Sequence, residues 1–127
     1  MNVVDSSGWL EYVAGEPNAG FFTPAIENTQ QLIVPAISLY EVFKRLYPQR
    51  GESTALNVIA HMLQGQVVEL NSTLAIAAAK TSLDLGLPMA DSIILTTART
   101  FEATFWTQDE HFNNIQGVRY IEKQRRR

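Results

Sequence analysis

Short apolar runs alternate along the chain with longer segments in which apolar residues recur every three or four positions. The run NVVD at 2–5 predicts a buried strand, and the segment 6–15 predicts a helix that ends at Gly15. The same two patterns continue along the chain. They assign further strands to 31–35, 67–70, 103–107 and 118–121, and further helices to 19–30, 37–47, 52–65, 71–86 and 90–102.

Prolines and glycines interrupt or end these predicted helices. Pro24 predicts an uneven helix at 19–30, and Pro48 predicts that the helix beginning at 37 ends before a separate helix begins at 52. Gly65 and Gly86 predict the ends of the helices that precede them.

The predicted elements run in the order strand, helices, strand, helices, strand, helices and two final strands. Such alternation predicts an α/β fold, a three-layer α/β/α sandwich with a mostly parallel central sheet. The 127 residues fit one domain, 1–127. Ligands of open parallel sheets bind beyond the carboxyl ends of the strands, so this edge is where functional residues are expected.

Four acidic residues fall where a parallel sheet would gather them at that edge. Asp5 closes the first strand, and Asp109 lies two residues beyond the fourth. Glu41 is in the first turns of the helix after the second strand, and Asp91 is in the first turn of the helix that leads into the fourth. The other acids lie on predicted helix faces, in strand interiors or in loops.

Each of these acids also has a simpler interpretation. Asp5 could cap a helix, Glu41 could be a solvated side chain, Asp91 could compensate a helix dipole, and Asp109 could begin a turn. Convergence on one edge favours a shared role instead. Clustered carboxylates repel one another, and a divalent cation removes that cost; an all-oxygen set suits Mg²⁺ or Mn²⁺.

Hydroxyl and imidazole groups lie close to these acids in the sequence. Ser6, Ser7 and Thr107 could hold waters or a carboxylate, with helix capping and turn formation as their alternative roles. His61 stands mid-helix among apolar residues and is expected to pack there. His111 could line the cleft or be an ordinary loop residue.

Composition narrows the class of protein. Hydrophobic residues make up 46% of the chain and charged residues 18%, which suits an ordinary core. The chain has no cysteine, which excludes disulfides and thiolate metal sites and makes a reducing cytoplasm the expected compartment. It lacks a signal-peptide pattern and any apolar run near the ~20 residues that span a bilayer, so we expect a soluble, cytoplasmic protein without membrane association.

The net charge of −3 is distributed unevenly. The last nine residues carry +4, so residues 1–118 carry −7. An acidic body argues against a protein that binds nucleic acid by charge alone. The basic tail could contact RNA through Arg125, Arg126 and Arg127, or could be a solvated end.

Four segments of the chain resemble the PIN domain: VVDSS, the helix with the lone Glu41, LPMADSIILTTA and WTQDEHF. The short single-domain form resembles the VapC toxins of bacterial and archaeal toxin–antitoxin pairs. The resemblance extends over nearly the whole chain, and its most specific pieces are LPxAD before an apolar helix and the later T-x-D-x-x-F. Glu110 and His111 depart from the commoner pattern, in which small or hydrophobic residues follow the last aspartate.

The resemblance implies an acidic quartet that binds one or two Mg²⁺ or Mn²⁺ ions, supported by hydroxyl groups. By this resemblance the quartet and its supports are Asp5, Glu41, Asp91 and Asp109 with Ser7 and Thr107. The implied activity is that of an endoribonuclease toxin that cleaves structured RNA, a tRNA or rRNA loop, with metal-activated water. The resemblance also implies a homodimer and a cognate VapB-like antitoxin, through which alone the toxin would contact DNA.

Two other classes stay open on the residues alone. A haloacid-dehalogenase-like phosphatase needs a second aspartate where Ser7 stands, and a phosphoacceptor receiver needs a lysine after a later strand, which ATFWT lacks. A non-catalytic binding module on the same scaffold would use exposed aromatic residues. The candidates are Trp9, Tyr12, Phe21 and Phe22, although core packing is the simpler role for Trp9.

Overall fold

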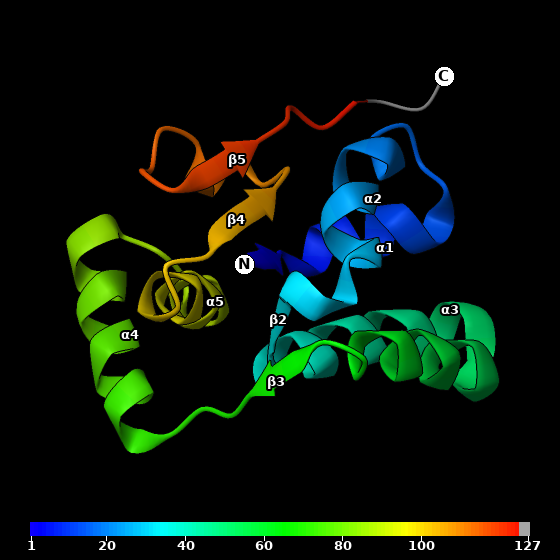
Figure 1. Ribbon diagram of the computed structural model, residues 1–127, viewed down its shortest axis with the longest axis horizontal. Coiled ribbons are helices and arrows are strands. Elements are labelled where there is room, and N and C mark those ends of the chain that lie inside the picture. Colours follow the sequence, from blue (N-terminus) through cyan, green and yellow to red (C-terminus); the bar gives the residue numbers. More distant parts are fainter. Residues whose placement is uncertain (125–127) are drawn as a thin grey trace.

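The computed structural model describes residues 1–124 and confirms the α/β fold (Figure 1). Its sheet has five strands in the order β3-β2-β1-β4-β5, and every neighbouring pair is parallel. The carboxyl ends of all its strands therefore meet at one edge. The strands are β1 (Asn2–Val4), β2 (Leu32–Pro35), β3 (Gln66–Val68), β4 (Thr104–Thr107) and β5 (Val118–Tyr120).

Helices connect the strands and cover both faces of the sheet (Figure 1). Two 3-10 turns, Thr29–Gln31 and Glu110–Phe112, precede β2 and follow β4. None of the helices within residues 1–124 is long and apolar enough to cross a membrane. The helices are α1 (Ser6–Ala14), α2 (Ala19–Glu27), α3 (Ala36–Met62), α4 (Ser72–Leu85) and α5 (Met89–Thr100).

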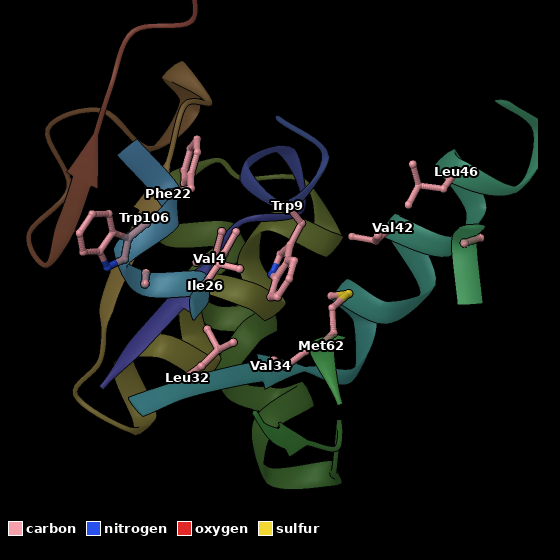
Figure 2. Close-up of a cluster of buried hydrophobic side chains, with 12 residues drawn as sticks. Val4, Trp9, Phe22, Ile26, Leu32, Val34, Val42, Leu46, Met62 and Trp106 are labelled. Carbon is pink, nitrogen blue, oxygen red and sulfur yellow. The ribbon is translucent and has the colours of Figure 1, made fainter. Parts of the chain in front are cut away.

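Neighbouring residues of each strand face different cores, because side chains alternate across a sheet. Val4 and its cross-strand partner Trp106 pack with α1, α2 and α3 in the cluster that Figure 2 shows. Val3 and its partner Phe105 pack on the other side with α5. The sheet is thus the middle of three layers, as the alternation of elements predicted.

Helix α4 packs against α5 and ends where its caps predict. The Leu74 N–H donates to Asn71 Oδ1 over 2.8 Å at the start of the helix. Gly86 ends it with φ 66°, a backbone conformation that glycine adopts at little cost. The helix contacts α5 more extensively than it contacts any other element.

The predicted break between two helices is present, but it lies at Gly51 and not at Pro48. Pro48 lies inside α3, and the break comes at Gly51, where φ is 83° and ψ is 166°. Proline fixes φ near the helical value, so it can stand in the last turn before a break, whereas the left-handed φ needs glycine. Element α3 therefore consists of two helical segments that meet at Gly51, within the gap predicted between 47 and 52. Pro24 likewise lies inside a continuous α2, which ends at Glu27 and is followed by the first 3-10 turn.

The aromatic residues considered for a binding face belong to the core instead. Trp9 and Phe22 are buried, and Tyr12 and Phe21 pack partly buried against the same cluster. The ring of His61 meets the ring of Trp9 edge-on at 5.5 Å between centroids, so His61 packs as expected. This arrangement contradicts the exposed aromatic surface on which a binding module would depend.

Gly8 provides a test of how closely α1 approaches α2 and the sheet. A Cβ atom at Gly8 would lie 2.6 Å from Phe22 Cε1 and 2.8 Å from Val4 Cγ1. Gly8→Ala should therefore lower the free energy of unfolding by about 1–3 kcal/mol in urea denaturation. Gly20→Ala is the matched control, because a Cβ at Gly20 meets nothing within 4 Å. Equal stability of the two variants would contradict the close approach.

Candidate functional site

The pairing of β1 with β4 brings the ends of these two strands together. Beyond the last paired residues, the Asp5 N–H donates to the Trp106 carbonyl over 2.9 Å. The buried Thr107 hydroxyl donates to Asp5 Oδ2 over 2.8 Å and accepts from the Asp109 N–H over 2.9 Å. One threonine hydroxyl thus joins the two aspartates at the carboxyl edge of the sheet.

Asp5 is both a helix cap and a buried carboxylate. Its Oδ1 accepts from the Ser6 N–H over 2.8 Å, and its Oδ2 also accepts from the Ser7 hydroxyl over 3.1 Å. The residue is only 4% exposed. Burial raises the pKa of Asp5 to about 7; the hydrogen bonds from Thr107 and Ser7 oppose this rise, and the nearby charges of Asp91 and Asp109 add to it.

Asp91 is held at the site by the helix that carries it. Helix α5 begins at Met89, and Asp91 stands in its first turn, while every residue from Ser92 to Ala98 is buried. Burial and the neighbouring charges of Asp109 and Glu41 raise the pKa of Asp91, whereas a hydrogen bond with His111 lowers it. Its position thus follows from the packing of α5 into the core.

His111 lies directly against two of the carboxylates. Its Nδ1 is 3.5 Å from Asp91 Oδ2 and 3.3 Å from Asp109 Oδ1. Ligand atoms of Asp91, Asp109 and His111 all lie within 4.8 Å of one another, a grouping that could hold a metal ion. From the sequence, His111 could line the cleft or be an ordinary loop residue. Its position two residues after Asp109 is the sequence feature that favours the cleft.

Glu41 reaches the same edge from α3. The Ser6 hydroxyl donates to Glu41 Oε1 over 2.7 Å, which ties the start of α1 to α3. Glu41 and Asp5 lie outside the compact group of Asp91, Asp109 and His111. The charge of Glu41 raises the pKa of Asp91, and the charges of Asp91 and Asp109 raise the pKa of Asp5. The four predicted acids therefore share one electrostatic environment.

A buried polar network behind the site was missed by sequence reasoning. Glu11 is 6% exposed and accepts from the Asn18 N–H and from Gln108 Nε2, each over 3.0 Å. Asn18 Nδ2 in turn donates to Gln108 Oε1 over 3.0 Å. The sequence pattern places Glu11 on a helix face and gives no sign of its burial, because its partners Asn18 and Gln108 lie 7 and 97 residues away. The network anchors Gln108, the residue before Asp109.

The structure describes the predicted supporting hydroxyl groups but not the predicted RNA contacts. Ser6, Ser7 and Thr107 all donate hydrogen bonds to the acids of the site. The proposed RNA contacts in the basic tail lie outside residues 1–124 and so outside the described structure; they are Arg125, Arg126 and Arg127.

Comparisons with known proteins agree with this fold. The family model of the PIN domain matches residues 3–118. A search of curated protein sequences finds no match. Solved structures with similar folds include a toxin–antitoxin complex from Klebsiella pneumoniae, with a TM-score of 0.78 and 18% identity over 93% of this chain and 95% of that chain.

Two further structures have comparable similarity. VapC20 from Mycobacterium tuberculosis, described as a toxin that cleaves the sarcin–ricin loop, gives a TM-score of 0.75 and 16% identity over 91% of this chain and 95% of that chain. DNA-bound VapBC from Salmonella typhimurium gives a TM-score of 0.74 and 17% identity over 96% and 97%. At these identities the structural likeness concerns the fold.

The raised pKa of Asp5 predicts a pH dependence of stability. Between about pH 4 and about pH 7 the folded protein keeps a proton on Asp5 that the unfolded chain releases. The free energy of unfolding should therefore fall as pH rises through this range, by an Asp5 contribution on the order of a few kcal/mol. Urea denaturation of metal-free protein at a series of pH values measures this fall.

Asp5→Asn is the comparison for this experiment, because it removes the titrating group and keeps an oxygen that can accept from the Ser6 N–H. Stability of the variant should depend less on pH, so the two curves should diverge toward neutral pH. Parallel curves would contradict a raised pKa for Asp5.

Proposed function

This chain belongs to the PIN domain family, and we propose that it is a metal-dependent endoribonuclease, the toxin of a type II toxin–antitoxin pair. The observation that carries this proposal is the convergence of carboxylates at the carboxyl edge of the sheet. Among residues 1–124 no lysine or arginine forms an ion pair with them, and the basic side chain in contact with them is His111.

The donor set suits a hard divalent cation. Asp91 and Asp109 present carboxylate oxygens to one point, and Asp5 is buried beside them. The charge of Asp109 helps to raise the pKa of both Asp5 and Asp91. We infer that Mg²⁺ or Mn²⁺ is held by Asp5, Asp91 and Asp109 with Glu41. Such an ion, when bound, lowers the pKa of a water and screens the charge of the phosphodiester.

The chain's own residues keep this site in shape. The Thr107 and Ser7 hydroxyls both donate to Oδ2 of Asp5, and the Ser6 N–H donates to Oδ1, which leaves the carboxylate few alternative orientations. Ser6 holds Glu41 in the same way. His111 donates a further nitrogen ligand or, when protonated, a counter-charge for the two aspartates that it contacts.

RNA is the substrate class that we propose, in the form of a structured RNA loop. The support is family membership together with VapC20, a similar fold that is described as cleaving the sarcin–ricin loop. A cognate antitoxin is the proposed partner, because similar folds were solved as toxin–antitoxin complexes. DNA contact would then come through the antitoxin.

A non-catalytic module on the same scaffold is the remaining alternative. The burial of Trp9 and Phe22 counts against the aromatic binding surface that this alternative needs. Calorimetric titration with MnCl₂ separates the two: a nuclease must bind the ion, and absence of binding at millimolar concentrations would favour the module.

Asp91→Asn tests the nuclease directly. The substitution keeps the size of the side chain and removes a charged ligand, so cleavage of a structured RNA with Mn²⁺ should fall at least about 100-fold. EDTA should abolish cleavage by the unaltered protein. The rate is measured on an end-labelled RNA hairpin by gel electrophoresis.

Asp84→Asn is the matched control, because Asp84 is exposed on α4 and the chemical change is the same. This variant should cleave like the unaltered protein. Persistent cleavage by the Asp91 variant would overturn the assignment of the site.

We further propose that a second copy of the chain covers the exposed apolar side chains of α4. Ile76 is 74% exposed and Leu83 is 86% exposed, seven residues apart and therefore on one face of the helix. Leu83→Glu should weaken dimerisation in sedimentation equilibrium at least about tenfold, while Asp84→Asn should not. A chain that stays monomeric, or a Leu83 variant that dimerises as before, would contradict this surface.

A further inference from the structure

A groove of about 630 Å³ runs beside the carboxylates, lined mainly by residues of α1 and α3, with Glu16, Gln108 and Lys123. Ser6, Ser7 and Glu41 belong to both features: they line the groove, and they hydrogen-bond one another or Asp5. A ligand that reached the acidic edge could therefore continue into this groove without leaving the protein surface.

The groove gathers most of the positive charge of the described chain. Lys44, Arg45, Arg50 and Lys123 line it, whereas the other lysines and arginines within residues 1–124 are Lys80, Arg99 and Arg119. Between residues 1–124 none of the four lining cations forms an ion pair with a carboxylate. In a body of charge −7 over residues 1–118, such a concentration of unpaired cations favours an anionic ligand.

The groove also contains three carboxylates, Glu11, Glu16 and Glu41. Glu11 accepts from Asn18 and Gln108, and Glu41 accepts from Ser6. The four cations exceed the three acids, and three of the cations, Lys44, Arg45 and Arg50, follow one another along α3.

An exposed aromatic ring stands at the rim of the same groove. Tyr40 is 61% exposed, next in sequence to Glu41. Lys44 Nζ donates to the Tyr40 hydroxyl over 3.2 Å and lies 5.3 Å from the centre of its ring. Positions 40 and 44 are neighbours on one face of the helix, so the ring and the cation form a unit.

An aromatic face beside cations is the chemistry that single-stranded nucleic acid requires. A base stacks on the ring, and the adjoining phosphates meet the cations. A duplex keeps its bases stacked and cannot offer one to Tyr40. An acidic peptide would use the cations alone and leave the exposed ring without a role.

We propose that this groove binds the single-stranded RNA that flanks the cleaved phosphodiester, with a base on Tyr40 and phosphates on Lys44 and Arg45. The proposal rests on the ribonuclease function proposed above and extends it, because it identifies the path of the strand away from the metal site. Tyr40 and Lys44 are positioning residues for the substrate.

Fluorescence anisotropy tests the groove without cleavage. The probe is a fluorescein-labelled single-stranded RNA of about ten nucleotides, in EDTA and at a series of salt concentrations. Lys44→Gln should weaken binding and reduce the slope of log K against log salt by about 0.7. Tyr40→Ala should weaken binding at least about fivefold with little change of slope, and Tyr40→Phe should restore it.

Lys80→Gln is the matched control, since Lys80 is exposed on α4 and the charge change is the same. Its affinity for the probe should equal that of the unaltered protein. Because Tyr40 and Lys44 are exposed, their substitution should leave the fold intact, and the variants should give the circular dichroism spectrum of the unaltered protein.

Four results would overturn the proposal. The first is that the protein binds no RNA at low salt, and the second is that Lys80→Gln and Lys44→Gln lose equal affinity for the probe. The third is that a duplex of the same length binds more tightly than the single strand. The fourth is that the Tyr40 and Lys44 variants lose affinity for an acidic peptide but not for RNA. Failure of the nuclease itself is a separate outcome. If cleavage depends on Asp91 but RNA binding is unchanged in the Tyr40 and Lys44 variants, only the groove proposal is refuted. If the Tyr40 and Lys44 variants lose RNA binding but the unaltered protein does not cleave RNA, only the nuclease proposal is refuted.

Discussion

The parallel pairing of β1 with β4 is the contact on which the site depends. Its register sets Val4 opposite Trp106, so the next residues of both strands leave the sheet side by side. The Thr107 hydroxyl then joins Asp5 to the backbone of Asp109. A slip of one residue would turn Val3 and Val4 to the wrong faces and separate the aspartates at once. Core packing and the site are thus set by the same pairing.

Local patterns were sufficient for most of the fold. Apolar runs located the strands, and Asn71 and Gly86 marked the ends of α4, because these signals act within a few residues of the chain. Pro48 predicted the end of the first segment of α3 too early, because proline disfavours the continuation of a helix but can stand in its last turn. The break lies at Gly51, where the backbone has a positive φ. Such competition between neighbouring signals is settled by tertiary packing.

The site was predictable as far as topology determines it. Asp5, Glu41, Asp91 and Asp109 could be gathered because parallel strands share an edge. The contact of His111 with Asp91 depends on how a 3-10 turn folds back, and the burial of Glu11 depends on Asn18 and Gln108. These contacts join residues that no periodicity relates, so only the folded structure could show them.

Helix α5 has a consequence for how long the site keeps its shape. Asp91 is attached to a segment whose next seven residues, Ser92 to Ala98, are all buried. The carboxylate cannot move far unless this segment leaves the core, and removing a core helix amounts to unfolding a domain of this size. The geometry at the acidic edge therefore lasts as long as the native state itself, and a ligand there would meet an arrangement already in place.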